Sequence, residues 1–434
     1  MTRTVGLYTL GCKVSQYETE AIGEAFEKRG FVVMPFDSVC DAYVINTCTV
    51  TAESDRKSRQ IIRRAIAANS GAVIAVVGCY SQRSPEEVAK INGVNVVFGT
   101  DNKLQIVDRV ISMLESGDRG VYTSVSSLDG ASFESMCVTR APRTRAYVKI
   151  EDGCESRCTY CAISSARGPV RSKRPEDVIS EVKGLYSRGT REVVLTGIET
   201  GSYGRDFDEN YTLADLICEL EREGCCERIR LGSLAPELID RAFVDKVKDV
   251  KILAPHFHLS MQSGSDNVLR GMKRRYNRQM ALDNVEYIRN NIKGAQFTTD
   301  LMVGFPGESE EDFLDTVDLV KRIKFIDVHV FSYSRRHGTP AASYEGQIEE
   351  SVKKERSRRL IDIKNEVRDS VLDRIVGAKE PLSVILETFD GGEYTAHSDS
   401  FIEVKVVAEE GLQGEMCQVI PESHSGGVIL AKML

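Results

Sequence analysis

Three cysteines lie within eight residues in the stretch DGCESRCTYC: Cys154, Cys158 and Cys161, here called the barrel cysteines. Structural zinc sites take four protein ligands, usually as two separated pairs, and no second pair follows this stretch. Three thiolates can instead hold a 4Fe-4S cluster, which leaves one iron open to chelate a substrate or a cofactor. The spacing therefore predicts an iron–sulfur cluster with one open iron, with a zinc knuckle as the alternative.

A second set, here called the sheet cysteines, is spread along the N-terminal part of the chain. Cys12, Cys48 and Cys79 each follow a short apolar stretch, LYTLG, AYVINT and AVIAVVG, that is typical of a buried β-strand. In an open parallel sheet the carboxyl ends of the strands share one edge, where such folds bind ligands. A single cysteine there is often only a small buried side chain. Three at equivalent strand ends favour a second, shared site.

The elements that must position the sheet cysteines lie in residues 1–125. Short apolar strands alternate there with amphipathic helices, such as those at 16–29, 54–68 and 103–115. This alternation predicts an N-terminal α/β domain with a doubly wound parallel sheet. Residues 126–142 are polar and have no clear period, so we expect a linker there.

The elements around the barrel cysteines lie in residues 143–376. Strand candidates alternate there with helical stretches, which predicts a partial (β/α)6 barrel followed by a basic linker helix. The six strands are expected at 146–150, 192–198, 228–234, 256–262, 297–305 and 327–333. In such barrels the strand ends and the loops after them build the active site. Because DGCESRCTYC directly follows the first strand, we expect the barrel cysteines at the catalytic mouth.

Residues 377–434 consist of short β-rich runs separated by glycine-rich turns, which predicts a small antiparallel β-barrel. This segment carries three lysines, no arginine and ten acidic residues. Phosphate binding needs local positive charge, so basic stretches elsewhere are the better candidates. They are RKSRQIIRR (56–64), ARGPVRSKR (166–174), KRRYNR (273–278), SRR (334–336) and KKERSRR (353–359).

The composition indicates a cytoplasmic enzyme. The formal net charge of −8 argues against indiscriminate binding to polyanions. The N-terminus has no signal-peptide pattern, and no apolar run approaches the roughly 20 residues that span a membrane, so we expect no membrane association. In a reducing compartment the twelve cysteines are better explained by metal or redox chemistry than by disulfides. The six outside the two sets are expected to be structural.

The stretch GCESRCTYC resembles the cluster motif of the radical S-adenosylmethionine (SAM) enzymes, in which the open iron binds SAM. TLGCKVSQYETE (9–20), INTCTVTAESDRKSRQ (45–60) and VVGCYSQ (76–82) resemble the N-terminal motifs of the methylthiotransferases. The resemblance continues through LTGIETGSYG, HLSMQSGSDNVLRGMKRRY and TTDLMVGFPGESEEDF. The chain is similar in particular to the MtaB-type members, which act on N(6)-threonylcarbamoyladenosine beside the tRNA anticodon.

This resemblance implies two 4Fe-4S clusters and SAM as cofactors. The cluster on the barrel cysteines would cleave SAM to a radical that abstracts hydrogen from C2 of the adenine, which makes these cysteines catalytic as well as metal ligands. The cluster on the sheet cysteines would supply sulfur, and another SAM would supply the methyl group. The expected SAM contacts near strand ends are Gly197, Ser233, Gln262, Val303, Gly304, Phe305 and Pro306.

The resemblance also implies the partners. These are tRNA carrying threonylcarbamoyladenosine and a reducing electron donor such as flavodoxin or ferredoxin. The C-terminal segment resembles the TRAM domain with which the family holds tRNA. Because that segment is acidic, the barrel and the basic linker helix are expected to make most of the phosphate contacts.

Other functions remain open from the sequence. A methylthiotransferase could act on isopentenyl-adenosine in tRNA or on an aspartate of a ribosomal protein. Another radical SAM enzyme, acting on a protein or a small molecule, would keep the barrel cysteines and need no tRNA. An electron-transfer protein with two clusters would need neither SAM nor a barrel.

Overall fold

The N-terminal part of the chain forms a parallel sheet of six strands. The computed structural model describes residues 2–141 and 143–434, so residue 142, at the end of the predicted linker, lies outside the described residues. The strands, in the order β2-β1-β3-β4-β5-β6, are β1 (Thr4–Thr9), β2 (Val32–Met34), β3 (Ala42–Thr47), β4 (Val73–Gly78), β5 (Val96–Phe98) and β6 (Tyr122–Ser124). Between β1 and β3 the direction of strand succession reverses, which is where doubly wound sheets bind ligands.

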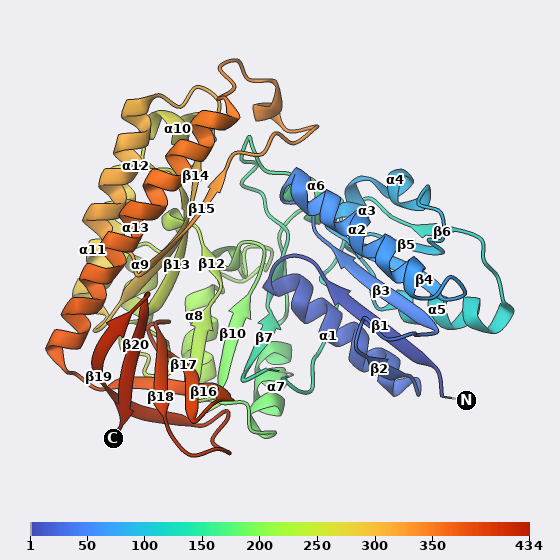
Figure 1. Cartoon of the computed structure of the whole chain (residues 1–434), viewed down its shortest axis with the longest axis horizontal. Coiled ribbons are helices and arrows are strands. Elements are labelled where there is room, and N and C mark those ends of the chain that lie inside the picture. Colours follow the sequence, from blue (N-terminus) through green and yellow to red (C-terminus); the bar gives the residue numbers. More distant parts are fainter. Residues whose placement is uncertain (1, 142) are drawn as a thin grey trace.

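Helices cover both faces of this sheet (Figure 1). On one face α1 (Lys13–Lys28) and α5 (Gln105–Ser116) contribute Ile22, Phe26 and Val110 to the core. The other face carries α2 (Ala52–Ala68), α3 (Cys79–Arg83) and α4 (Pro85–Ala89). Since both faces are covered, β3 and β4 are buried along their whole length, as the continuous apolar runs predict. The predicted doubly wound sheet is confirmed.

The central part is an open barrel of parallel strands. One hydrogen-bonded group has the order β11-β10-β7 and the next has the order β12-β13-β14-β15. The strands are β7 (Arg145–Lys149), β10 (Glu192–Thr196), β11 (Arg228–Leu231), β12 (Ser233–Leu234), β13 (His256–Gln262), β14 (Gln296–Val303) and β15 (Asp327–Ser332). The single strand predicted at 228–234 is divided at Gly232, whose N–H bonds back to the carbonyl of Leu195 at 2.8 Å.

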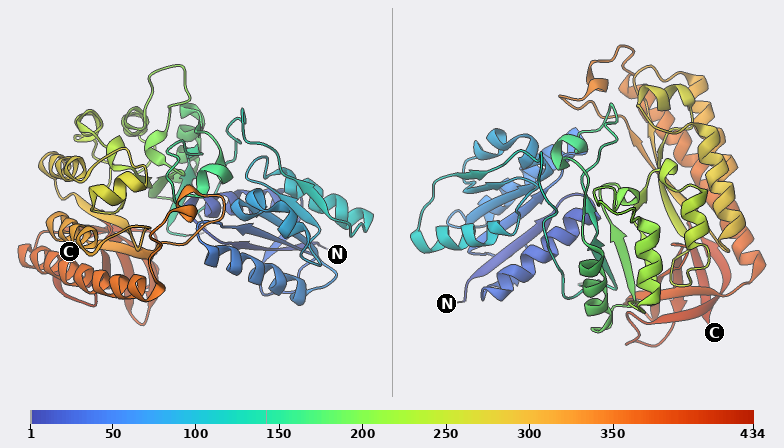
Figure 2. Two further views of the ribbon diagram at one scale, coloured as in Figure 1. Left: turned by 90° about the horizontal axis from the view of Figure 1, so that it is seen from above. Right: turned by 180° about the vertical axis from the view of Figure 1, so that it is seen from behind.

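Helices surround the outside of this barrel (Figure 2). The main ones are α7 (Pro175–Tyr186), α8 (Leu213–Arg222), α9 (Arg241–Val247), α10 (Asp266–Gly271), α11 (Arg278–Asn291) and α12 (Glu310–Ile323). The loop after β7 carries β8 (Glu151–Asp152), α6 (Ile163–Arg167) and β9 (Arg171–Ser172). This loop contains the barrel cysteines, so they stand at the carboxyl end of the first barrel strand.

The long helix α13 (Glu350–Ala378) leads to a closed barrel of five strands. The strands are β16 (Leu382–Asp390), β17 (Glu393–Ser398), β18 (Glu403–Val407), β19 (Met416–Ser425) and β20 (Val428–Met433). The predicted antiparallel barrel is confirmed, although no apolar run predicts β17, and β18 and β20 pair in parallel. This C-terminal barrel lies against the amino ends of the central barrel's strands (Figure 1). At this contact Arg230 donates to the carbonyl of Asp399 at 2.8 Å.

No helix among the described residues has the length and apolar character needed to cross a membrane. All twelve cysteines are free. The domain boundaries at residues 125, 142 and 376 stay predictions. The first two lie between β6 and β7, which belong to different sheets, whereas residue 376 lies inside α13.

Candidate iron–sulfur and cofactor sites

The sheet cysteines end three neighbouring strands. Cys12 follows β1 and caps α1, Cys48 follows β3, and Cys79 opens α3 directly after β4. Because β1, β3 and β4 are adjacent in the sheet, the three side chains share one edge. Gly11 has a φ of +124°, and a Cβ there would lie 3.5 Å from the Cys48 sulfur. The turn before Cys12 therefore requires glycine to bring the backbone close to Cys48.

The charges of the sheet cysteines act on one another. Burial raises the pKa of Cys79 to about 11, and the negative charges of Cys12 and Cys48 add to this rise. Burial also raises the pKa of Cys48. Metal binding requires thiolates and releases protons. The thiols of Cys48 and Cys79 therefore favour the protonated form until a metal group binds.

The barrel cysteines lie in the segment between β8 and α6, where Cys158 and Cys161 share a turn. The N–H of Cys161 bonds to the carbonyl of Cys158 at 3.0 Å, and the N–H of Cys154 bonds to Gly168 at 3.0 Å. Burial raises the pKa of Cys154 to about 11, with a smaller contribution from the charge of Cys161. The N–H of Ile163 points at the Cys161 sulfur at 3.3 Å. Such N–H···S bonds tune the potential of iron–sulfur clusters.

Both sets fit a cluster better than a single ion. Among the residues that the structure describes, no three histidine, cysteine or acidic side chains converge closely enough to hold one metal ion. The thiolates around a cubane stand farther apart than the ligands of one ion. Three cysteines in each set, N–H donors to sulfur and a nearby arginine make a donor set that fits a 4Fe-4S cluster.

Each set also has an arginine at one sulfur. Arg167 on α6 donates to the Cys79 sulfur at 3.2 Å, although it belongs to the loop of the barrel cysteines. Arg274 donates to the Cys158 sulfur at 3.4 Å and to the carbonyl of Ser260 at 2.9 Å. Positive donors of this kind favour the thiolate form that binds iron.

Arg167 is part of a buried group of five charges, here called the interface charge cluster: Glu18, Lys103, Lys149, Asp152 and Arg167. Glu18 Oε1 accepts from Lys103 at 2.8 Å, from Lys149 at 2.9 Å and from Arg167 at 2.6 Å. Asp152 accepts from Lys149 at 2.6 Å and from Arg167 at 3.1 Å. Three cations face two carboxylates, so a positive excess lies directly behind Cys79.

The expected SAM residues stand at carboxyl ends of barrel strands. Gly197 follows β10, and a Cβ there would meet Glu151 Oε2 at 2.4 Å, so glycine is required by this contact. Glu151 Oε2 accepts the N–H of Glu199 at 2.9 Å, while the buried Oε1 has no partner among the described residues. Burial raises the pKa of Glu199 to about 7. Burial also raises the pKa of Glu151 well above its usual range, so its unpartnered oxygen lacks a cationic partner within the described part of the chain, and an amino group such as that of SAM would fit there.

The other expected SAM residues have distinct surroundings. Ser233 is half-buried in β12, and Gln262 ends β13 with a φ of +68°, a strained conformation for this residue. Val303 ends β14, and Pro306 is buried in the loop that follows it. In that loop, Glu308 Oε2 accepts the N–H groups of Gly304 at 2.5 Å and Phe305 at 3.1 Å. All these residues lie at the end of the barrel that carries the barrel cysteines.

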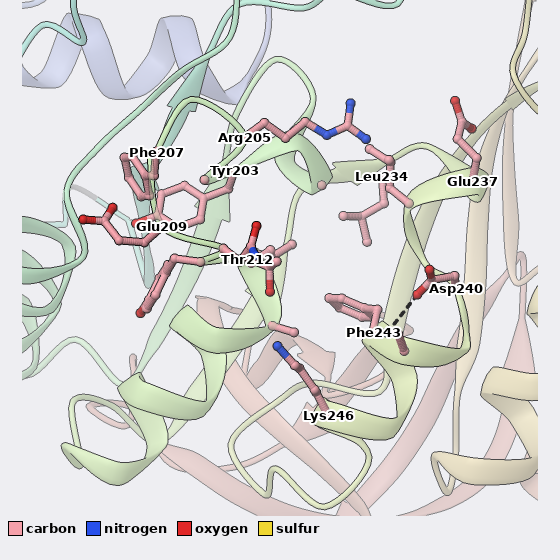
Figure 3. A pocket seen from close by; sticks show the side chains of 18 residues that line it. Tyr203, Arg205, Phe207, Glu209, Thr212, Leu234, Glu237, Asp240, Phe243 and Lys246 are labelled. Atoms are coloured by element: carbon pink, nitrogen blue, oxygen red, sulfur yellow. Dashed lines mark hydrogen bonds between the residues drawn. The ribbon is translucent and has the colours of Figure 1, made fainter.

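A cavity of about 560 Å³ lies outside this edge, between α8, α9 and the loop after β10 (Figure 3). Tyr203 and Phe207 pack edge to face at 5.7 Å on one wall, and Asp240 caps α9 on the other. Within the described residues, its lining contains no cysteine and none of the expected SAM contacts. We therefore assign it no cofactor.

Sequence reasoning missed the acidic and basic groups behind the two sites. Glu151, Glu199 and Glu18 are isolated in the sequence and carry no spacing signal. Arg167 and Arg274 were expected to lie in basic stretches that contact RNA, and the structure instead places them against cysteine sulfurs.

The other basic stretches also contain internal residues. Lys353 and Arg356 on α13 are each 5% exposed, and Arg356 bonds to Glu308 at 3.0 Å. Arg336 is buried and bonds to Asp55 at 2.7 Å. A helix that packs on the core along one side buries the basic residues of that side, so a run of Lys and Arg does not by itself form an exposed patch.

Comparison with known proteins agrees with this arrangement. The Radical SAM superfamily model matches residues 148–320, and the model of Uncharacterized protein family UPF0004 matches residues 4–99. The chain is 39% identical to the threonylcarbamoyladenosine tRNA methylthiotransferase MtaB of Bacillus subtilis, covering 96% of this chain and 93% of that protein. It is 40% identical to the MtaB of Thermotoga maritima, over 86% and 85% of the two chains.

A further relative has a different named product. The tRNA-2-methylthio-N(6)-dimethylallyladenosine synthase of Desulforamulus reducens is 35% identical, covering 83% of this chain and 79% of that protein. Among solved structures, the radical SAM methyltransferase TsrM of Kitasatospora setae superposes with a TM-score of 0.58 at 16% identity, over 79% of this chain and 77% of that one. This last likeness concerns the fold alone. With two cysteine triads at the ends of parallel strands and near-full-length relatives above 30% identity, the chain belongs to the radical SAM methylthiotransferase family.

Proposed function

We propose that this chain adds a methylthio group to C2 of N(6)-threonylcarbamoyladenosine next to the tRNA anticodon. The observation that carries the proposal is the 39% identity to an MtaB protein across 96% of the chain. Two separate cysteine triads, one in each α/β unit, support it, because an electron-transfer protein would not need the second unit or the barrel. Relatives named for the dimethylallyl product reach 32–35% identity and form the second candidate.

Members of this family use SAM and 4Fe-4S clusters, and we assign one cluster to the barrel cysteines and one to the sheet cysteines. When bound, these groups supply a radical that takes hydrogen from C2, and the sulfur and methyl group that replace it. The chain supplies position and shielding. Arg167 and Arg274 hold thiolates by charge-assisted hydrogen bonds, and Glu151 offers an acceptor beside Gly197 where SAM is expected.

The proposed partners follow from this reaction. The substrate is a tRNA that already carries the threonylcarbamoyl group. A low-potential donor such as flavodoxin or ferredoxin supplies the electron for SAM cleavage. Among the remaining proposed contacts, Ser233, Gln262 and the segment 303–306 would surround SAM at the strand ends.

The test is the nucleoside composition of tRNA from cells with and without the gene. We expect the 2-methylthio derivative of threonylcarbamoyladenosine to disappear on deletion and the unmethylthiolated nucleoside to accumulate. Loss of the 2-methylthio derivative of dimethylallyladenosine instead would establish the second candidate. No change in either nucleoside would refute both.

A further inference from the structure

A cavity of about 570 Å³ lies where the central barrel, α13 and the C-terminal barrel meet. This volume falls within the range of about 300–1,000 Å³ that is typical of ligand pockets. Its lining includes the cationic side chains of Lys13, Lys364 and Arg368, and it also includes His258 and His329. The lining also carries the carboxylates of Asp327 and Glu403, so three Lys and Arg side chains face two acidic ones.

Most of these groups already have acidic partners. Lys364 pairs with Asp327 at 2.7 Å, and both His258 and His329 bind Asp300 at 3.3 Å. Lys13 differs, because it has no ion-paired carboxylate anywhere in the described chain; the negative groups near it are Asp300, already shared by the two histidines, and Cys12.

Burial lowers the pKa of Lys13, so the charged form of this lysine needs an anionic partner. Arg230 and Arg145 place further positive charge near it. Glu192 pairs with Arg228 at 3.1 Å and with Arg230 at 2.8 Å, while Arg145 has its closer partner in Glu387 at 2.6 Å, so two carboxylates serve three arginines. A half-buried lysine beside an arginine cluster, lining an open cavity, is an incomplete ion site.

The position of Lys13 relates it to the reacting atom. Lys13 is the first residue of α1 and directly follows Cys12, one of the sheet cysteines proposed to hold the sulfur-supplying cluster. In adenine, C2 and the N6 substituent lie on the same Watson–Crick edge, separated by the ring atoms N1 and C6. Lys13 therefore adjoins the proposed sulfur source in the chain, and its side chain lines the cavity. The threonylcarbamoyl substituent ends in a carboxylate, whereas the dimethylallyl substituent is an uncharged hydrocarbon.

We propose that Lys13 binds the carboxylate of the threonylcarbamoyl group and so selects this nucleoside over hydrophobic N6 substituents. The inference rests on the proposed function and adds a specificity-determining residue to it. A charge-assisted bond in a partly desolvated cavity discriminates strongly, because an analogue without the carboxylate leaves the lysine unpaired.

The test measures binding rather than turnover. Iron-reconstituted protein is titrated with anticodon stem-loops that differ only in one adenosine, which carries threonylcarbamoyl, dimethylallyl or no substituent. We expect the wild-type protein to bind the threonylcarbamoyl RNA most tightly. Lys13→Gln should weaken the affinity for that RNA by about tenfold, or about 1.4 kcal/mol, and leave the affinities for the other two RNAs unchanged. Lys13→Arg should keep the preference for the threonylcarbamoyl RNA.

Two controls separate the outcomes. Lys364→Gln removes a cation from the same cavity that is already paired with Asp327, and should leave the ratio of the three affinities unchanged. A stem-loop whose threonine carboxylate is replaced by a carboxamide probes the unchanged protein, and should lose the same factor of about ten. This second measurement keeps the test valid if Lys13→Gln loses iron.

Equal weakening of all three RNAs by Lys13→Gln would show a backbone phosphate contact and overturn the inference. Undiminished binding of the carboxamide RNA to the wild-type protein would overturn it as well. The proposed function fails separately, if the wild-type protein neither prefers the threonylcarbamoyl RNA nor converts it to the methylthio product.

Discussion

Replacing Glu18 by glutamine should destabilise the contact between the N-terminal sheet and the central barrel. Glu18 lies on α1, is fully buried, and has one oxygen that accepts from Lys103, Lys149 and Arg167 at 2.6–2.9 Å. Lys149 and Arg167 belong to the central barrel, so the carboxylate of Glu18 joins the N-terminal sheet to that barrel. Glutamine keeps the shape of the side chain and removes its charge.

The magnitude follows from what remains after the change. Lys149 and Arg167 keep Asp152, at 2.6 and 3.1 Å, but Lys103 keeps only the carbonyl of Thr100 at 2.6 Å. Leaving a buried charge without its partner costs about 3–5 kcal/mol, and the surviving bonds to Asp152 place this variant near about 3 kcal/mol. At about 2 °C per kcal/mol for a chain of this size, the unfolding midpoint should fall by about 6 °C.

The assay is thermal unfolding of iron-free and reconstituted protein under anaerobic conditions. Glu223→Gln is the matched control, because Glu223 pairs with Lys183 at 2.7 Å on the surface, and it should leave the midpoint unchanged. If Glu18→Gln unfolds at the same temperature as Glu223→Gln, the interface charge cluster does not join the two units as described.

The remaining predictions concern iron, sulfur and RNA. Replacing the three barrel cysteines by alanine should halve the iron bound by reconstituted protein and abolish SAM cleavage, and continued cleavage would disprove their assignment. Replacing the three sheet cysteines should also halve the iron and stop methylthio formation, while SAM cleavage without product continues; methylthio product from this variant would contradict their role. Reversing the exposed Lys354 and Arg358 to Glu should reduce the salt slope of tRNA binding by about 0.7–0.9 per lost phosphate contact. Reversing the buried Lys353 and Arg356 should instead lower the unfolding midpoint, and unchanged midpoints would show that these residues are free to bind RNA.

The architecture could be predicted because the signals that define it are local. The apolar runs and their spacing predict the strands of the central barrel and those of the N-terminal sheet except β6 (Tyr122–Ser124), which has no such run. Parallel topology then requires Cys12, Cys48 and Cys79 to share an edge. The errors in the fold were also local. Gly232 divides one predicted strand into two, and the polar strand Glu393–Ser398 lacks the apolar run that would have revealed it.

The charged residues could not be predicted in the same way. A run such as ARGPVRSKR has the composition of a phosphate-binding patch, yet Arg167 is fully buried and Arg171 is 5% exposed. Whether an arginine is exposed depends on acidic partners far away in the sequence; Glu18, for example, precedes Arg167 by 149 residues. Short-range patterns contain no information about such pairs, so the basic stretches were assigned to RNA when several of their members stabilise the interior.

The position of Arg167 has a consequence for how the two proposed clusters depend on each other. It follows Cys161 on the loop of the barrel cysteines, but its guanidinium donates to the Cys79 sulfur at 3.2 Å. Without iron, the interface charge cluster holds three cations against two carboxylates. None of the five is more than 3% exposed, so this excess of positive charge is unfavourable. Thiolates at the sheet cysteines would neutralise that excess, since iron binding converts the protonated thiols to anions. Binding of iron to the N-terminal sheet should therefore also strengthen its contact with the core, because the cation that balances the new charge belongs to the core.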